Sequence, residues 1–232
     1  MKRISILVSF LICFLLIVQF VLAENDSKAT KWLSKEQEEA LVATVPPPPA
    51  VDSPEDKADY AAMLAAQNGR TPEIIAECKH YQSFGYKLFE DIYGKELTDD
   101  RAPKFQKLMK TVLETTRVIN DNAKEKYRRL RPYQEHRDTV HALFAVGGYS
   151  YPSGHSMGSF TLAVVLGAVF PDKQQAFLDR AAQIAQSRVS AGVHNPSDIK
   201  EGEVVGKATG AAILASPAFQ ADLAEVKAEL AK

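Results

Sequence analysis

The chain has 232 residues, of which 46% are hydrophobic and 25% are charged, a balance that excludes wholesale disorder. Its 28 Lys and Arg residues against 29 Asp and Glu residues give a formal net charge of -1, so no basic excess points to nucleic acid or to an anionic membrane surface as a partner. The length suits one domain with enough chain to bury a hydrophobic core.

The first residues have the pattern of a secretory signal peptide. Lys2 and Arg3 precede an almost unbroken apolar run at 4–22, and small residues around Ala23 form a cleavage site. We expect residues 1–23 to be removed during export. An uncleaved membrane anchor is the alternative, because the apolar run approaches the length that spans a bilayer.

Cleavage would leave residues 24–232 as one mature domain, located in the periplasm or secreted. Residues 24–50 form an N-terminal extension that ends in the extended proline stretch Pro46–Pro49. Cys78 would be the single cysteine of this domain, so no intramolecular disulfide can form. Its apolar neighbours predict a buried, unreactive thiol.

Helices are predicted along the whole mature chain. Most begin at a Ser, Thr or Asp that can cap them, several carry proline at the first position, and apolar residues recur at intervals of three and four. No run of alternating polarity predicts a strand, and no uncharged stretch after the signal is long enough to span a bilayer. The expected fold is therefore all-α, a single-domain helical bundle. The predicted helices are one after a capping box at Ser34 and Gln37, then 53–69, 71–94, 98–131 (capped by Thr98) and 156–169, one after a capping box at Asp172 and Gln175, and two that open at Ser197 and at Ser216.

The first segment with chemical interest is a basic stretch that ends at Pro132. Lys124, Arg128 and Arg131 stand at i, i+4 and i+7, so a helix would place three cations on one face. Such a stripe alone is usually a solvated surface. Because Pro132 stops the predicted helix at Arg131, however, the guanidinium lies at a helix end, where its planar fork can hold two phosphate oxygens.

The second segment is Ser153-Gly154-His155, just before an apolar helix. Free amide groups and the positive end of the dipole favour an anion at a helix N-terminus, and Gly154 lets the backbone come close to a ligand. Ser153 could be only an N-cap, and a histidine at a helix start is often structural. Those readings leave unexplained why a hydroxyl, a glycine and a histidine occur together there.

The third segment contains Arg188, His194 and Asp198. A carboxylate four residues after a histidine can accept the ring N–H, fix the tautomer and leave the other nitrogen free to attack. Asp198 could also simply complement the dipole of the next helix, but that reading does not account for His194.

Taken together, the three segments resemble the signature of the phosphatidic acid phosphatase type 2 and vanadium haloperoxidase superfamily. Its pattern is Lys, six residues, Arg-Pro; then Pro-Ser-Gly-His; then Ser-Arg, five residues, His, three residues, Asp, and the chain matches every fixed position. Within this superfamily the chain is similar to the class A bacterial nonspecific acid phosphatases, which share the proline stretch and the secretory signal. The resemblance covers most of the chain from Pro46 to the region after Asp198.

The resemblance implies a broad-specificity acid phosphatase that hydrolyses small-molecule phosphomonoesters without metal or cofactor. His194 is then the nucleophile that forms a phosphohistidine, Asp198 orients it, and His155 is the general acid that protonates the leaving alcohol. A mildly acidic optimum follows, because His155 must enter protonated and His194 as a free base. The groups implied to bind the phosphoryl group are Lys124, Arg131, Ser153, Gly154 and Arg188.

Several alternatives stay open at this point. A vanadium-dependent haloperoxidase would use the same cationic site for vanadate, and an apyrase-like nucleotide polyphosphate hydrolase or a phosphotransferase could use it for a related reaction. A non-catalytic phosphate-binding module would need the cations but neither histidine. Asn195-Pro196 stands where class A members usually have an aromatic residue, so the wall that faces the substrate can differ. The sequence also leaves a homodimer open.

Overall fold

The structure is a computed structural model that describes residues 30–98 and 100–232, and the secondary structure of these residues is entirely helical. This confirms the predicted all-α bundle. The predicted signal peptide lies outside the described residues. None of the helices described is both long and apolar enough to cross a membrane. The α-helices are α2 (Lys35–Thr44), α3 (Pro54–Asn68), α4 (Pro72–His80), α5 (Glu90–Tyr93), α6 (Pro103–Tyr127), α7 (Pro132–Glu135), α8 (Gly154–Val169), α9 (Gln174–Ser190), α10 (Pro196–Ala215) and α11 (Pro217–Leu230), with 3-10 turns η1 (Tyr86–Phe89), η2 (Lys95–Thr98) and η3 (Pro171–Lys173).

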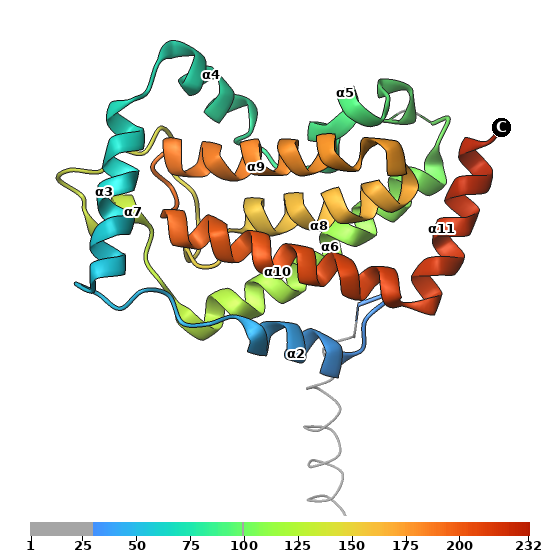
Figure 1. Cartoon of the computed structure of the whole chain (residues 1–232), viewed down its shortest axis with the longest axis horizontal. Coiled ribbons are helices and arrows are strands. Elements are labelled where there is room, and N and C mark those ends of the chain that lie inside the picture. Colours follow the sequence, from blue (N-terminus) through green and yellow to red (C-terminus); the bar gives the residue numbers. More distant parts are fainter. Residues whose placement is uncertain (1–29, 99) are drawn as a thin grey trace, which may run out of the picture.

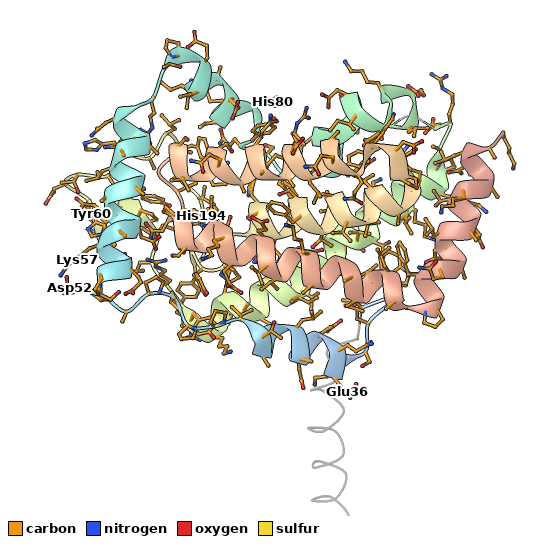
Figure 2. The ribbon with its side chains drawn as sticks, viewed as in Figure 1. Glu36, Asp52, Lys57, Tyr60, His80 and His194 are labelled. Atoms are coloured by element: carbon orange, nitrogen blue, oxygen red, sulfur yellow. The ribbon has the colours of Figure 1, made fainter. Side chains whose placement is uncertain are left out.

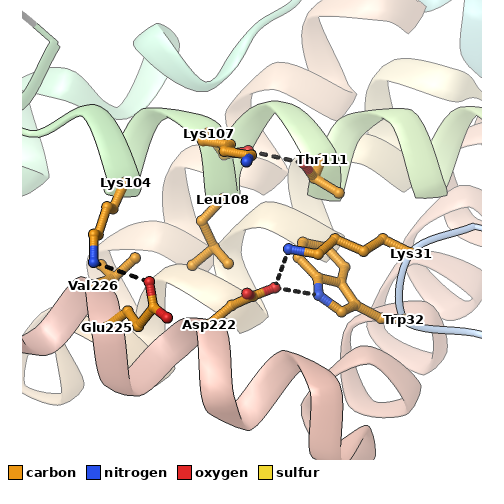
Figure 3. A pocket seen from close by; sticks show the side chains of 9 residues that line it. All are labelled: Lys31, Trp32, Lys104, Lys107, Leu108, Thr111, Asp222, Glu225 and Val226. Atoms are coloured by element: carbon orange, nitrogen blue, oxygen red, sulfur yellow. Dashed lines mark hydrogen bonds and ion pairs between the residues drawn. The ribbon is translucent and has the colours of Figure 1, made fainter.

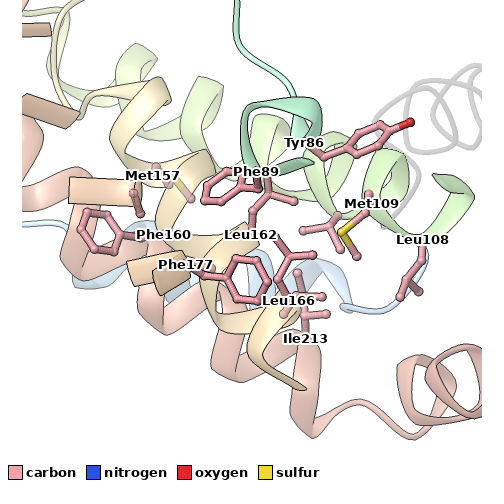
Figure 4. Close-up of a cluster of buried hydrophobic side chains, with 14 of the residues drawn as sticks. Tyr86, Phe89, Leu108, Met109, Met157, Phe160, Leu162, Leu166, Phe177 and Ile213 are labelled. Carbon is pink, nitrogen blue, oxygen red and sulfur yellow. The ribbon is translucent and has the colours of Figure 1, made fainter. Parts of the chain in front are cut away.

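Helix α8 is the centre of the bundle. It packs against α6, α9 and α10, which run beside it along the long axis of the molecule, while α3 and α11 close the two ends (Figure 1). Its side chains are apolar or small on every side, and a helix of that kind must be buried all round. Leu162 and Leu166 of α8 are fully buried in a cluster with Phe177 of α9, Met109 of α6 and Phe89 of η1 (Figure 4).

The predicted helix starts are largely confirmed where a local cap fixes them. Ser34 forms its capping box with Gln37, and the hydroxyls of Ser53 and Thr71 accept the backbone N–H three residues later. The last helix opens at Ser216-Pro217 as predicted.

Four predicted boundaries are wrong. The helix from Thr71 ends at His80, and the chain continues as short turns because Tyr86, Phe89 and Tyr93 must reach the core. The long helix α6 begins at Pro103 after Ala102 rather than at Thr98. Asp172 lies in a 3-10 turn and makes no capping bond, so α9 begins without one, and α10 begins after Asn195 rather than at Ser197.

Glycines allow α10 to lie directly on the backbone of α8. Gly202, Gly206 and Gly210 stand four residues apart and so share one face of α10. A Cβ atom on Gly202 would lie 2.7 Å from the Ser153 carbonyl oxygen, and one on Gly206 would be closer still to the carbonyl oxygen of Met157. The two main chains therefore touch, which fixes the start of α8 relative to the start of α10.

Replacing Gly206 with alanine should lower the free energy of unfolding by about 2–3 kcal/mol or more, because the new methyl group meets rigid backbone rather than a movable side chain. Gly85→Ala is the matched control, since its Cβ would have no neighbour within 4 Å and its backbone is extended. Denaturant unfolding of both variants measures the difference. Equal midpoints for the two would contradict the close contact.

The N-terminal extension is attached to the last helix. Lys31 Nζ and Trp32 Nε1 both donate to Oδ2 of Asp222, at 2.6 and 2.7 Å (Figure 3). The Trp32 ring meets that of Phe219 edge-on at 5.1 Å. Lys31, Trp32 and Asp222 border a pocket of about 180 Å³ between α6 and α11. The start of the described chain is therefore attached to α11, at the end of the bundle away from α3 (Figure 1).

Cys78 is fully buried, as predicted, and its Sγ lies 3.3 Å from the carbonyl oxygen of Ser187. Burial raises the pKa of this thiol, so it stays protonated and unreactive.

Candidate active site

The predicted site residues gather at the end of the bundle that α3 covers. This is where α6 ends, α8 begins, and the chain turns from α9 into α10. Figure 2 shows His194 at that turn, on the side of the bundle that carries α3. Segments that lie far apart in the sequence therefore contribute to one location.

His194 and Asp198 form a buried pair. His194 Nδ1 lies 3.3 Å from Asp198 Oδ2, and the exposed fractions of the two residues are 2% and 0%. Burial acts to raise the pKa of Asp198, but bonds and charge from His194, with the Arg129 cation, hold it well below its usual range. An ionised carboxylate can only accept, so Nδ1 carries the proton and Nε2 is left with a free lone pair.

Arg131 lies on the other side of the His194 ring. Its Nη1 is 3.1 Å from His194 Nε2 and 3.0 Å from the carbonyl oxygen of Val193. The carbonyl oxygens of Gly147 and Gly148 accept from Nη2 and Nε, so the guanidinium is held in one orientation beside the nitrogen that would attack.

The structure corrects how Arg131 reaches this place. Helix α6 ends at Tyr127, and Arg128 adopts a left-handed backbone conformation with φ of 49°. Arg128 is exposed and pairs with Glu125 on the surface, so the predicted face of three cations on one helix does not exist. Arg131 instead precedes Pro132 at the start of α7, and only the change of direction after α6 turns it inward.

Lys124 comes to the same site from the last turn of α6. Its Nζ donates to the carbonyl oxygens of Tyr149 and Ser150. Burial, together with the positive charge of Arg131, lowers the pKa of this ammonium group to about 7. Lys124 is therefore a cation that an anion in the site would stabilise.

Arg188 is the clearest sign that the site takes an anion. Its side chain is completely buried, Nη1 donates to the Tyr81 carbonyl oxygen at 3.2 Å, and the ring of Phe144 lies 5.1 Å from the guanidinium. Nε and Nη2 have no hydrogen-bond partner among the described residues. Burial and the nearby Arg131 lower the pKa to about 10, so the group keeps its charge at neutral pH. Buried charged donors without partners are costly, and an anion is what would satisfy them.

The second predicted segment forms the first turn of α8. Ser153 is the N-cap, and its Oγ accepts the N–H of Ser156 at 3.4 Å. Gly154 packs closely on Asn120, whose Oδ1 would lie 3.0 Å from a Cβ atom at that position. The Ser153 N–H donates to the Asp198 carbonyl oxygen at 3.0 Å, which holds the positive end of α8 against the start of α10.

His155 is half-buried beside these groups. Its Nε2 lies 3.2 Å from the carbonyl oxygen of Gln82, and its ring contacts that of Phe84 at 5.1 Å. Burial and the charge of Arg188 lower the pKa of His155 to about 3, and burial lowers that of His194 as well, so both rings are neutral in the empty site. The expectation that His155 enters the reaction protonated therefore depends on the negative charge of a bound substrate.

Two residues of the site were missed from the sequence. Arg129 Nη1 donates to Asp198 Oδ1 at 2.8 Å, and the Ser150 hydroxyl donates to the other oxygen. Arg129 stands between two arginines that the spacing did single out, and nothing in the local pattern distinguishes it from them.

Comparison with known proteins identifies the family. Residues 108–221 match the PAP2 superfamily. The chain is 30% identical to a non-specific acid phosphatase of Providencia stuartii over 87% of its own length and 85% of the relative's, and 29% identical to one of Salmonella typhi over 93% and 91%. The fold is similar to that of a bacterial vanadium-dependent iodoperoxidase, with a TM-score of 0.63 at 19% identity, covering 78% of this chain and 54% of the other. The chain therefore belongs to the PAP2 superfamily, as a phosphatase related to the non-specific acid phosphatases.

Proposed function

We propose that the protein is an exported acid phosphatase that hydrolyses small phosphomonoesters through a phosphohistidine on His194. The observation that carries the proposal is the pairing of His194: Nδ1 faces Asp198 and Nε2 faces Arg131, with Lys124 and Arg188 as further cations of the site. A phosphate-binding protein would need the cations but not an imidazole held in one tautomer. The signal-like residues 1–23 support export to the periplasm or beyond.

In the first step Nε2 of His194 attacks phosphorus and the bond to the ester oxygen breaks. The leaving alkoxide takes a proton from His155. Because Nε2 of His155 faces the Gln82 carbonyl oxygen, this role falls to Nδ1. Water then attacks the phosphohistidine, gives its proton to His155, and phosphate leaves with His194 restored.

Cations take the place that a metal ion holds in many phosphoryl-transfer enzymes. Lys124, Arg131 and Arg188 would neutralise the equatorial oxygens of the transition state. Their combined positive charge disfavours a divalent cation at the same place. We therefore propose that the reaction needs no metal.

The test is release of phosphate from p-nitrophenyl phosphate by the purified protein at mildly acidic pH, with chelator present. Vanadate should inhibit competitively, because a trigonal-bipyramidal vanadate on His194 mimics the transition state. Loss of activity in chelator that a divalent ion restores would contradict the cationic site. Oxidation of bromide by the vanadate-loaded protein, without phosphate release, would favour the haloperoxidase alternative.

His155→Ala should lose activity according to the leaving group. General acid catalysis contributes about 10²- to 10⁴-fold and matters most for a basic alkoxide, so the variant should be crippled on alkyl phosphates yet retain more activity on p-nitrophenyl phosphate. Steady-state kinetics on a series of esters measures how the loss of activity depends on the pKa of the leaving alcohol. A uniform loss across the series would show that His155 is not the proton donor.

The pKa of Lys124 predicts a pH dependence of anion binding. Below about pH 7 the ammonium is charged and attracts an anion, and above it the empty site loses that charge, so affinity should fall as pH rises. Sulfate is a suitable probe because it stays a dianion over this range, and its inhibition constant should weaken by up to about tenfold per pH unit. Lys124→Arg, which stays charged, should flatten the slope. A wild-type sulfate affinity that is constant from pH 6 to pH 9 would contradict the role of Lys124.

A further inference from the structure

A chain of ion pairs extends from the His194–Asp198 pair to α3. Arg129 follows α6, and its side chain is 8% exposed. Its Nη1 lies 2.8 Å from Asp198 Oδ1 and 2.7 Å from Ser197 Oγ. Its Nη2 lies 3.2 Å from a carboxylate oxygen of Asp56 and 3.2 Å from one of Asp59, both on α3. One guanidinium thus holds three carboxylates together.

Asp59 also holds the start of α10. Its Oδ1 accepts the N–H of Ser197 at 2.9 Å, and its Oδ2 accepts the Ser197 hydroxyl as well as Arg129 Nη2. Because Ser197 directly precedes Asp198, α3 contacts the residue that orients His194 both through Arg129 and through the backbone. The bond geometry of this cluster leaves few orientations for the Asp198 carboxylate.

The two oxygens of Asp198 have separate sets of donors. Oδ1 faces Arg129, while Oδ2 accepts from the Asn195 N–H at 2.8 Å, from the Ser150 hydroxyl and from His194 Nδ1. Arg129 is the only charged group of the described residues that bonds to Oδ1. Without Arg129 the carboxylate could rotate, and its two oxygens would exchange their hydrogen-bond donors. Nδ1 of His194 would then lose its fixed acceptor.

On these contacts we propose that Arg129, held by Asp59 of α3, is a positioning residue for the phosphoryl-transfer reaction. It acts through Asp198, which it fixes in the orientation that keeps the proton on His194 Nδ1 and the lone pair on Nε2. Arg129 does not touch His194, and its own bonds lie on the far side of the carboxylate. This inference rests on the proposed function, but the orientation of His194 that it explains can be measured without any turnover.

The charges around Asp198 give the expected direction of a pH effect. His194 bonds to the carboxylate from the α9–α10 turn, and Lys124 and Arg131 are further cations near the pair from α6 and α7. Asp59 and Asp56 face it from α3, beyond Arg129. Without the Arg129 cation between them, the negative charges of the two α3 aspartates are no longer neutralised and repel the charge of Asp198 more strongly. The carboxylate and the imidazole should then both take up protons at higher pH than in the wild type.

The test compares Arg129→Met and Arg129→Lys with Arg128→Met. Arg128 is the neighbouring arginine, is exposed, and pairs only with Glu125, so it controls for the loss of one positive charge in the same segment. Because Arg129→Met leaves three carboxylates together and can fail to fold, the double variant R129M/D59N, which removes one of those negative charges, is measured beside it. Two readouts are used. The first is kcat and KM, each measured as a function of pH, and the second is the ¹⁵N chemical shifts of the His194 ring.

We expect Arg129→Met or the double variant to lower kcat about ten- to a hundredfold with KM little changed, and to move the acid limb of the profile to higher pH. The ¹⁵N shifts should show the Nδ1-protonated tautomer losing its dominance, with partial rescue in Arg129→Lys and no change in Arg128→Met. A folded Arg129 variant that keeps the wild-type pH profile and the wild-type His194 tautomer would overturn the proposal. If the wild type released no phosphate, the proposed function would fail, while the tautomer comparison would still decide the role of Arg129.

Discussion

His194→Ala is expected to abolish phosphate release from every phosphomonoester, by more than about 10⁴-fold, because the proposed phosphohistidine forms on this ring. The loss should not depend on the leaving group, unlike that of His155→Ala. The ring is buried, Nδ1 faces Asp198 and Nε2 is the proposed attacking atom, so its removal takes away the nucleophile and not merely a charge. Initial rates on aryl and alkyl phosphates measure the effect.

Acid quench of the wild type with a radiolabelled ester should trap phosphate on the protein, and His194→Ala should trap none. His141→Ala is the matched control, because His141 is an exposed histidine with no predicted role in the site. Trapped phosphate that remains in His194→Ala, or that maps to His155, would reverse the two roles.

Arg188→Met should separate activity from stability. Arginine groups that neutralise a transferring phosphoryl group are worth about 10³- to 10⁵-fold in rate, so activity should fall by that order. The free energy of unfolding without ligand should stay the same or rise, because Nε and Nη2 are buried in the empty site without partners. The increase in melting temperature that sulfate gives the wild type should be much smaller in the variant.

Arg180→Met provides the comparison on the same helix. Arg180 of α9 pairs with Asp91 and donates to the Leu88 carbonyl oxygen. Its loss should lower stability modestly and leave activity unchanged. If Arg188→Met instead destabilised the empty protein as severely as it reduced the rate, the buried guanidinium would be a structural group rather than an anion ligand.

Local signals in the sequence predicted the starts of α2, α3, α4 and α11. The hydroxyls of Ser34, Ser53 and Thr71 act within one helical turn, so the sequence alone contains what fixes them. The break after His80 and the left-handed residue at Arg128 could not be predicted in this way. Both depend on where buried aromatic side chains and carbonyl groups of other segments lie.

The same distinction holds for the site. His194 and Asp198 are four residues apart, and their contact follows from the turn that joins them. Arg129 and Asp59 are 70 residues apart, and they meet only because α3 closes the end of the bundle. The spacing of residues in the sequence predicts which side chains are neighbours within one helix or turn. The ion pairs that support the site join different helices, and the spacing does not predict how those helices pack.

The backbone contact between α8 and α10 also bears on how the substrate range of this enzyme could be redesigned. Gly202 and Gly206 have no side chain, and any larger residue there would collide with the α8 backbone. The distance between the starts of α8 and α10 therefore cannot be adjusted in small steps by mutation. Phe84 and Phe144 are different, because they lie in connecting segments and contact His155 and Arg188 with their rings. A mutant library that varies these two positions and keeps the glycines should change which phosphate esters are hydrolysed, as judged by their alcohol groups. The arrangement of the groups around the phosphoryl group should stay the same.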